Sequence, residues 1–102
     1  MKIDHVAIWT DDLEKEKDFF TKYFKCRAGK KYLNPIRHFS SYFLQFSDGM
    51  RIELMNQEGT IPGKAENVHG LAHIAFDVGT TEMVDRMTDQ LEKDGMVIDG
   101  RP

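Results

Sequence analysis

The chain of 102 residues contains few of the features that mark secreted, membrane-spanning or nucleic-acid-binding proteins. Cys26 is the only cysteine, which excludes an intrachain disulfide and favours a reducing cytoplasm. No apolar run approaches the roughly 20 residues that span a bilayer. With 14 basic and 17 acidic residues the net charge is −3, so we expect no general attraction to nucleic acid or to an anionic membrane. A single small cytoplasmic domain is the expected outcome.

Two histidines lie in near-copies of one short segment. The first copy, residues 4–8, reads DHVAI, and the second, residues 72–76, reads AHIAF. Each has the pattern of a strand, and each is followed by a helix-like stretch of about a dozen residues. The repeat of a strand and a helix, with a histidine in each strand, predicts two modules related by pseudo-symmetry. His5 and His73 would then meet near the pseudo-symmetry axis.

The first half of the chain predicts a strand, a helix and three further strands. Asp11 and Glu14 have capping-box spacing at the helix start, and Asp48-Gly49 is a hairpin signal between two strand-like runs. The expected elements are a strand over 2–9, a helix over 12–24, a short strand over 27–33, and hairpin strands over 39–46 and 50–55.

The second half begins to repeat this order. A strand over 71–78, a helix from Thr80 or Thr81 to about Asp94, and the start of a strand over 96–98 are expected. The fold class is therefore α+β, with paired βαβββ modules that form a curved mixed sheet with helices outside. The single domain over 1–102 would comprise a first module over 1–56, a linker over 57–70, and the start of a second module over 71–102, which is incomplete in this chain.

Three polar residues lie on strand faces opposite apolar ones: His5, Glu53 and His73. A sheet backed by helices would gather them on its concave face. Two imidazoles and a carboxylate suit a divalent ion such as Zn²⁺, Ni²⁺, Co²⁺, Fe²⁺ or Mn²⁺, and three protein ligands leave positions open for substrate. A lone histidine in a strand is more often structural, and a lone glutamate is more often solvated. The repeat favours the metal site, while His38 and His69 lie in loop-like stretches and are expected at the surface.

These motifs resemble the vicinal oxygen chelate superfamily, which includes glyoxalase I, methylmalonyl-CoA epimerase, extradiol dioxygenases, and fosfomycin and bleomycin resistance proteins. The resemblance covers essentially the whole chain. It rests on the segments 4–8, 12–24, 52–54 and 73–78. It implies that His5, Glu53 and His73 are metal ligands. It also implies a fourth ligand, a glutamate that would lie beyond Pro102.

The order His, Glu, His is most similar to the glyoxalase I branch. It implies proton abstraction from a small metal-chelated α-hydroxycarbonyl substrate, with Glu53 also able to move the proton. Three positions depart from the residues that glyoxalase I uses for glutathione: Trp9, Gln57 and His69. Glutathione hemithioacetal is therefore a doubtful substrate.

Two other functions stay open at this point. One is a non-catalytic small-molecule binder of the bleomycin-resistance type, in which Trp9, Tyr42 or Phe43 would stack on a drug-like ligand. The other is a dioxygenase of the same superfamily. A homodimer with metal sites between its subunits is expected, because His5 and Glu53 come from the first module and His73 from the second. The incomplete second module would also leave strand edges and apolar surface that favour association.

Overall fold

The computed structural model describes residues 1–63 and 69–100, and the chain divides into two compact units, Met1–Lys64 and Ala65–Pro102. The first unit contains a mixed five-stranded sheet and one helix, and the second contains one helix. Together these elements confirm the α+β class. The first unit has the predicted order βαβββ, except that the first strand after the helix is split in two. Within residues 1–63 and 69–100, neither helix combines the length and the apolar character that a membrane span requires.

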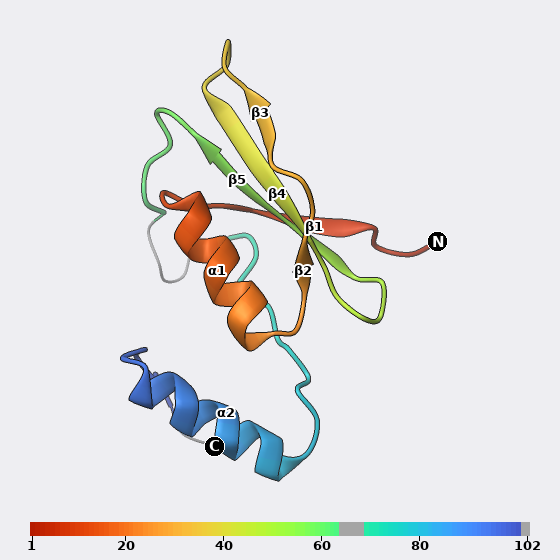
Figure 1. The fold of residues 1–102 in the computed structure, drawn as a ribbon, viewed down its shortest axis with the longest axis vertical. Helices are drawn as coiled ribbons and strands as arrows, with labels where there is room; N and C mark the ends of the chain where they lie inside the picture. The colour runs from red at the N-terminus through yellow and green to blue at the C-terminus, as the bar shows by residue number, and fades with distance from the viewer. Residues whose placement is uncertain (64–68, 101–102) are drawn as a thin grey trace. The chain divides into compact units, whose positions relative to one another are not determined.

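The sheet of the first unit consists of β1 (His5–Trp9), β2 (Arg27–Ala28), β3 (Tyr32–Asn34), β4 (Phe39–Gln45) and β5 (Arg51–Gln57). β1 lies at one edge, next to β5 from the other end of the unit (Figure 1). The order is β1-β5-β4-β2, and β3 pairs with β4. β1 and β5 run parallel, with His5 opposite Arg51 and Ala7 opposite Glu53, whereas the other pairs are antiparallel.

Helix α1 (Leu13–Tyr23) lies against one face of this sheet (Figure 1). Its N-cap is Asp12, whose carboxylate accepts a hydrogen bond from the backbone N–H of Lys15, so the N-cap lies one residue after Asp11, the cap residue of the predicted capping box. The core is formed by buried side chains of the helix and the strands, Leu13, Phe20, Cys26, Leu44, Ile52 and Leu54. Burial of this apolar surface holds the helix on the sheet.

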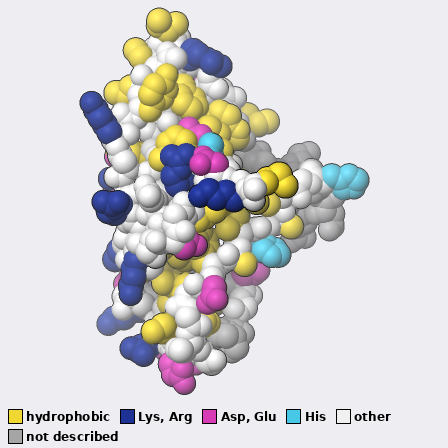
Figure 2. Space-filling view, turned by 90° about the vertical axis from the view of Figure 1, so that its right-hand side faces the viewer, with side chains coloured by type: hydrophobic (Ala, Val, Ile, Leu, Met, Phe, Trp, Pro, Cys, Tyr) yellow, Lys and Arg dark blue, Asp and Glu magenta, His cyan; other side chains and the backbone are white. Residues whose placement is uncertain are grey.

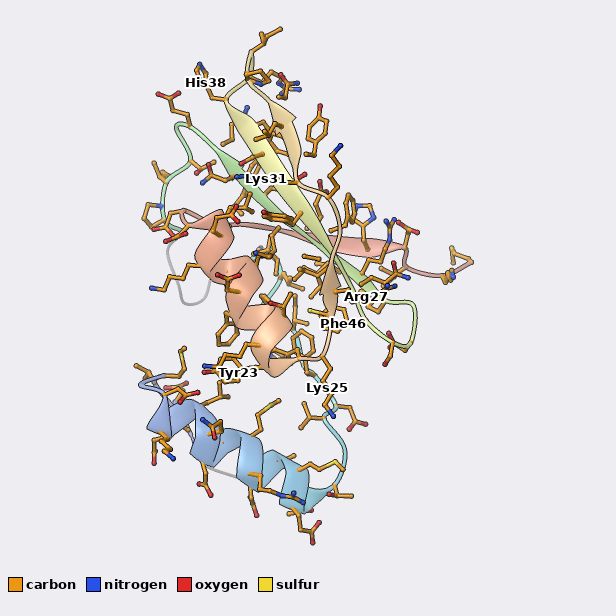
Figure 3. All side chains as sticks on the ribbon, viewed as in Figure 1. Tyr23, Lys25, Arg27, Lys31, His38 and Phe46 are labelled. Atoms are coloured by element: carbon orange, nitrogen blue, oxygen red, sulfur yellow. The ribbon has the colours of Figure 1, made fainter. Side chains whose placement is uncertain are left out.

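The carboxylate of Glu14 connects α1 to the sheet instead of capping the helix. It accepts a hydrogen bond of 2.8 Å from the Tyr42 hydroxyl and forms an ion pair of 3.0 Å with Lys31, a residue labelled in Figure 3. The hydrogen bonds from Lys31 and from Tyr42 lower the pKa of Glu14 below its ordinary value of 4.5. The folded state therefore favours the charged carboxylate.

This shift predicts a pH-dependent contribution of Glu14 to stability. A carboxyl whose pKa is lower in the folded state stabilises the fold above its unfolded pKa, and the contribution disappears as the pH falls through the folded value. Glu14→Gln should lower the urea midpoint at pH 7, and the difference from the wild type should shrink below pH 4.5. Glu16→Gln removes a carboxylate from the same turn and is the control. A midpoint difference that is independent of pH would contradict the prediction.

The second unit contains α2 (Thr81–Lys93), capped by Thr80 and followed by Gly95 in a left-handed conformation. Both ends agree with the predicted helix. The predicted strands over 71–78 and 96–98 are wrong, because neither segment is paired in a sheet of the described residues. Alternation of apolar and polar residues suits a strand, but a strand also needs a partner to complete its backbone hydrogen bonds.

The predicted strands of the first unit need small corrections. The first strand begins at His5 and not at residue 2, because its partner β5 begins at Arg51. The strand predicted over 27–33 is divided into β2 and β3 around Gly29. The hairpin turn is at Asp48-Gly49 as predicted, with Gly49 at φ +90°, and β5 extends to Gln57. The predicted linker over 57–70 includes residues 64–68, which lie outside the described residues.

Candidate metal site

The two faces of the first unit's sheet carry different chemistry. Side chains alternate along each strand, so the face that contacts α1 includes Tyr42, Leu44 and Leu54. The opposite face, called the open face below, presents side chains of β1, β4 and β5: His5, Trp9, Phe39, Phe43, Arg51 and Glu53. In Figure 2 hydrophobic side chains gather in the upper part of the view, with acidic, basic and histidine side chains together below them.

His5 and Glu53 meet on the open face. The Nε2 atom of His5 lies 3.8 Å from Oε1 of Glu53. The pairing of β1 with β5 produces this contact, because it sets Glu53 opposite Ala7, one step along the same face from His5. Glu53 keeps only 18% of its side-chain surface exposed, and His5 keeps 35%. A partly buried carboxylate beside an imidazole is a pair able to hold a cation or to move a proton.

The imidazole of His5 contacts Asp4 and Phe43, and Arg51 contacts both of these residues. Its Nδ1 atom lies 2.7 Å from Oδ2 of Asp4, and the same carboxylate oxygen accepts a hydrogen bond from the guanidinium of Arg51. The ring of Phe43 meets the imidazole edge to face with centroids 5.1 Å apart, and Arg51 lies 4.5 Å above that phenyl ring. The hydrogen bonds with His5 and Arg51 hold the pKa of Asp4 below its ordinary value, so Asp4 is charged at neutral pH.

An aromatic group extends along the open face from the other end of β1. Trp9 packs edge to face on Phe39 at 6.3 Å, and Tyr32 packs on the same phenyl ring at 5.9 Å. Trp9 and Tyr32 remain about half exposed, at 52% and 53%. Tyr42 does not join them, because it lies on the helix-covered face and its hydroxyl is bonded to Glu14. Tyr42 therefore lies on the other face from Trp9 and Phe43, and stacking of a ligand on Trp9, Tyr42 or Phe43 stays a prediction.

The remaining histidines lie apart from the His5–Glu53 pair or in the other unit. His38, at the tip of the β3–β4 hairpin (Figure 3), is exposed and lies 3.4 Å from Glu58, and His69 is exposed too. Both agree with the predicted surface positions. His73 is an exposed residue of the second unit. Over residues 1–63 and 69–100 no three metal-ligating side chains form a group, and His73 as a third ligand stays a prediction.

The His5–Glu53 pair fits two positions of a metal coordination shell. Ligand atoms at about 2.0 to 2.2 Å from one ion lie roughly 3 to 3.5 Å from each other, so the observed 3.8 Å needs only a small side-chain adjustment. A neutral imidazole that donates its Nδ1–H to Asp4 carries its lone pair on Nε2, the atom that lies 3.8 Å from Glu53 and can bind a cation. The donor set of one imidazole and one carboxylate suits Zn²⁺, Mn²⁺ and the other divalent ions named above.

Sequence reasoning missed Asp4 and Arg51 as members of this site. The adjacency of Asp4 to His5 was a visible signal, since a carboxylate beside a ligating histidine often binds its second ring nitrogen. Arg51 carried no comparable signal. Its position depends on the parallel pairing of β1 with β5, which brings together residues that are 46 positions apart, 5 and 51.

The family of the chain follows from a match to one protein-family model. The family model described as the Glyoxalase/Bleomycin resistance protein/Dioxygenase superfamily matches residues 2–102. The chain belongs to this superfamily. A search of curated proteins found no match to the chain. The resemblance seen in the sequence motifs is thus confirmed at the level of the superfamily.

Solved structures of this superfamily share the fold. A trypanothione-dependent glyoxalase I from Leishmania major matches with a TM-score of 0.81 and 22% identity, over 100% of this chain and 72% of its own. FosX, a fosfomycin resistance protein from Listeria monocytogenes determined with Mn(II) and a dihydroxypropylphosphonic acid, gives 0.78 and 21%, over 99% and 75%. A possible glyoxalase from Bacillus cereus gives 0.73 and 23%, over 97% and 79%. At these identities the likeness shows the fold and not the activity.

Proposed function

We propose that this superfamily member is a metal-dependent, glyoxalase I-like lyase or isomerase that acts on a small α-hydroxycarbonyl compound. The observation that carries the proposal is the 3.8 Å approach of His5 Nε2 to Glu53 Oε1 on the open face. His5 and Glu53 would be two ligands of a divalent ion, and His73 a third. Relatives with this fold include a glyoxalase I and a fosfomycin resistance protein that holds Mn(II), which supports the proposal.

The chemistry follows from the positions of the two side chains. A bound divalent ion would act as a Lewis acid toward two adjacent substrate oxygens. Glu53, partly buried beside His5, would accept the proton from the hydroxyl-bearing carbon next to the carbonyl and return it to the former carbonyl carbon. The hydroxyl proton would pass to the former carbonyl oxygen. This isomerisation needs no oxidant, because no atom or electron pair leaves the substrate overall.

Two features of the open face limit the substrate. Trp9 occupies a position where glyoxalase I often has an arginine, and the amide of Gln57 donates to the carbonyl of Arg37. Neither supplies a cation for the carboxylates of glutathione. The half-exposed group formed by Trp9, Phe39 and Tyr32 instead offers apolar surface. A small or apolar hydroxycarbonyl compound is therefore the better candidate.

The test combines metal content and turnover. Purified protein should bind one equivalent of a divalent ion and, so loaded, isomerise a small α-hydroxyketone. It should turn over the hemithioacetal of methylglyoxal and glutathione at less than about 1 s⁻¹, the lower end of the usual enzymatic range. Glu53→Gln should abolish isomerisation, and Glu58→Gln, at an exposed glutamate of the same unit, should not. Rapid hemithioacetal turnover would contradict the substrate assignment.

The aromatic group favours a second candidate, a small-molecule binder without catalysis. Trp9 and Tyr32 are exposed on the same face as Phe43. Exposed aromatic rings on one face can stack on a planar ligand. Metal content discriminates the two functions, because such a binder needs no metal.

The homodimer expected from the sequence is part of either proposal, and light scattering at micromolar concentration would report it as twice the mass of the 11.8 kDa chain.

A further inference from the structure

The imidazole of His5 is held by a charged pair that bridges the entry to β1 and the start of β5. Asp4, the residue before β1, lies 2.7 Å from Nδ1 of His5. The guanidinium of Arg51 donates to the same carboxylate oxygen, Oδ2. Arg51 is also the register partner of His5 across the parallel pair, so the backbone ladder fixes both ends of the bridge.

This arrangement selects one tautomer of His5. A charged carboxylate accepts hydrogen bonds and donates none, so Nδ1 of a neutral imidazole must carry the proton in this contact. The lone pair is then on Nε2, the atom that faces Glu53 at 3.8 Å. Without the carboxylate the proton could occupy either nitrogen, and the Nε2–H tautomer would have no lone pair directed at Glu53.

The ring plane is restrained as well as the tautomer. Phe43 contacts the imidazole edge to face at 5.1 Å, and Arg51 covers the phenyl ring at 4.5 Å. Arg51 thus contributes twice, once through the carboxylate and once through the aromatic ring. The contacts of the imidazole with Asp4 and Phe43, both supported by Arg51, oppose rotation of the His5 ring, although its side chain is 35% exposed.

We infer that Asp4 and Arg51 form a positioning pair that holds His5 in the Nδ1–H tautomer, with Nε2 directed at Glu53. The role in metal binding rests on the proposed function, whereas the tautomer itself does not. Asp4 and Arg51 are positioning residues, because they act on the ion through His5. Carboxylates that bind the second nitrogen of ligating histidines typically contribute about 10- to 100-fold to metal affinity.

The test measures the tautomer and the metal affinity separately. Nitrogen NMR of ¹⁵N-histidine-labelled, metal-free protein at about pH 8, above the ordinary pKa of histidine, should show a protonated Nδ1 and an unprotonated Nε2 for His5. Asp4→Ala should convert His5 to a mixture of tautomers and weaken Mn²⁺ or Zn²⁺ binding by about 10- to 100-fold. Asp4→Glu should recover part of both. Asp11→Asn, which removes an exposed carboxylate beyond the other end of β1, should change neither.

The tautomer measurement tests the positioning role of Asp4 and Arg51, and the metal titration tests the proposed metal site. A wild-type His5 protonated at Nε2, or a tautomer unchanged in Asp4→Ala, would overturn the positioning role. A wild-type protein that binds neither ion would contradict the metal site, while the NMR result would still decide the tautomer. Arg51→Gln should shift the tautomer in the same direction as Asp4→Ala, and circular dichroism of each variant would show whether it is folded.

Discussion

Replacing His5 by alanine is expected to reduce the affinity for a divalent ion by more than about 100-fold. Loss of an outer-sphere partner alone costs about 10- to 100-fold, and His5 is a direct ligand in this account. The Nε2 atom of His5 is the only histidine nitrogen that an observed contact places against Glu53 within the described residues. Competition titration with a chromophoric chelator would measure the change for Zn²⁺, Mn²⁺, Ni²⁺ and Co²⁺.

The matched control is His38→Ala. His38 is also paired with a glutamate, Glu58, but it lies at the exposed tip of the β3–β4 hairpin. Its removal should leave the affinity unchanged. His73→Ala should weaken binding in the same way as His5→Ala if His73 is the third ligand. Stoichiometric metal in the double variant that lacks both His5 and His73 would place the site elsewhere.

Replacing Leu44 by alanine should have the largest effect on stability. Leu44 is fully buried near the end of β4, between Ala28 of β2 and Ile52 of β5 in the sheet register. Leucine-to-alanine changes at such sites cost about 3 kcal/mol, because apolar contact is lost and a cavity remains. Small domains are stable by only about 5 to 15 kcal/mol. A large fall in the urea midpoint is therefore expected.

The control for this prediction is Leu33→Ala. Leu33 lies in β3 of the same sheet and is 64% exposed. Its truncation should change the free energy of unfolding by about 0.5 kcal/mol or less. Equal midpoints for Leu44→Ala and Leu33→Ala would contradict the assignment of the core to the face under α1.

The parts of the fold that sequence predicted best depend on local chemistry. Both helices begin and end close to the expected residues, because cap side chains such as Asp12 and Thr80, and the glycine at position 95, act within one turn. The hairpin at Asp48-Gly49 is local in the same sense. The strand predicted over 71–78 failed because a strand depends on a partner elsewhere in the chain.

In the candidate site, too, residue type and strand face were predictable from the sequence, whereas contacts that depend on strand pairing were not. His5 and Glu53 were predicted from residue type and strand face, and the structure brings them together. Tyr42 was grouped with Phe43, although neighbouring residues of a strand point to opposite faces. Arg51 could not be placed, because only the parallel pairing of β1 with β5 sets it opposite His5.

The predictions on metal binding depend on the proposal that His5 Nε2 and Glu53 bind one divalent ion on the open face. A crystal structure of the protein loaded with Zn²⁺ or Mn²⁺ would locate this ion by its anomalous scattering. We expect the ion at about 2.0 to 2.2 Å from His5 Nε2 and from a carboxylate oxygen of Glu53, with Asp4 still bonded to Nδ1. An ion bound at other residues, or at His5 without Glu53, would rule the proposal out.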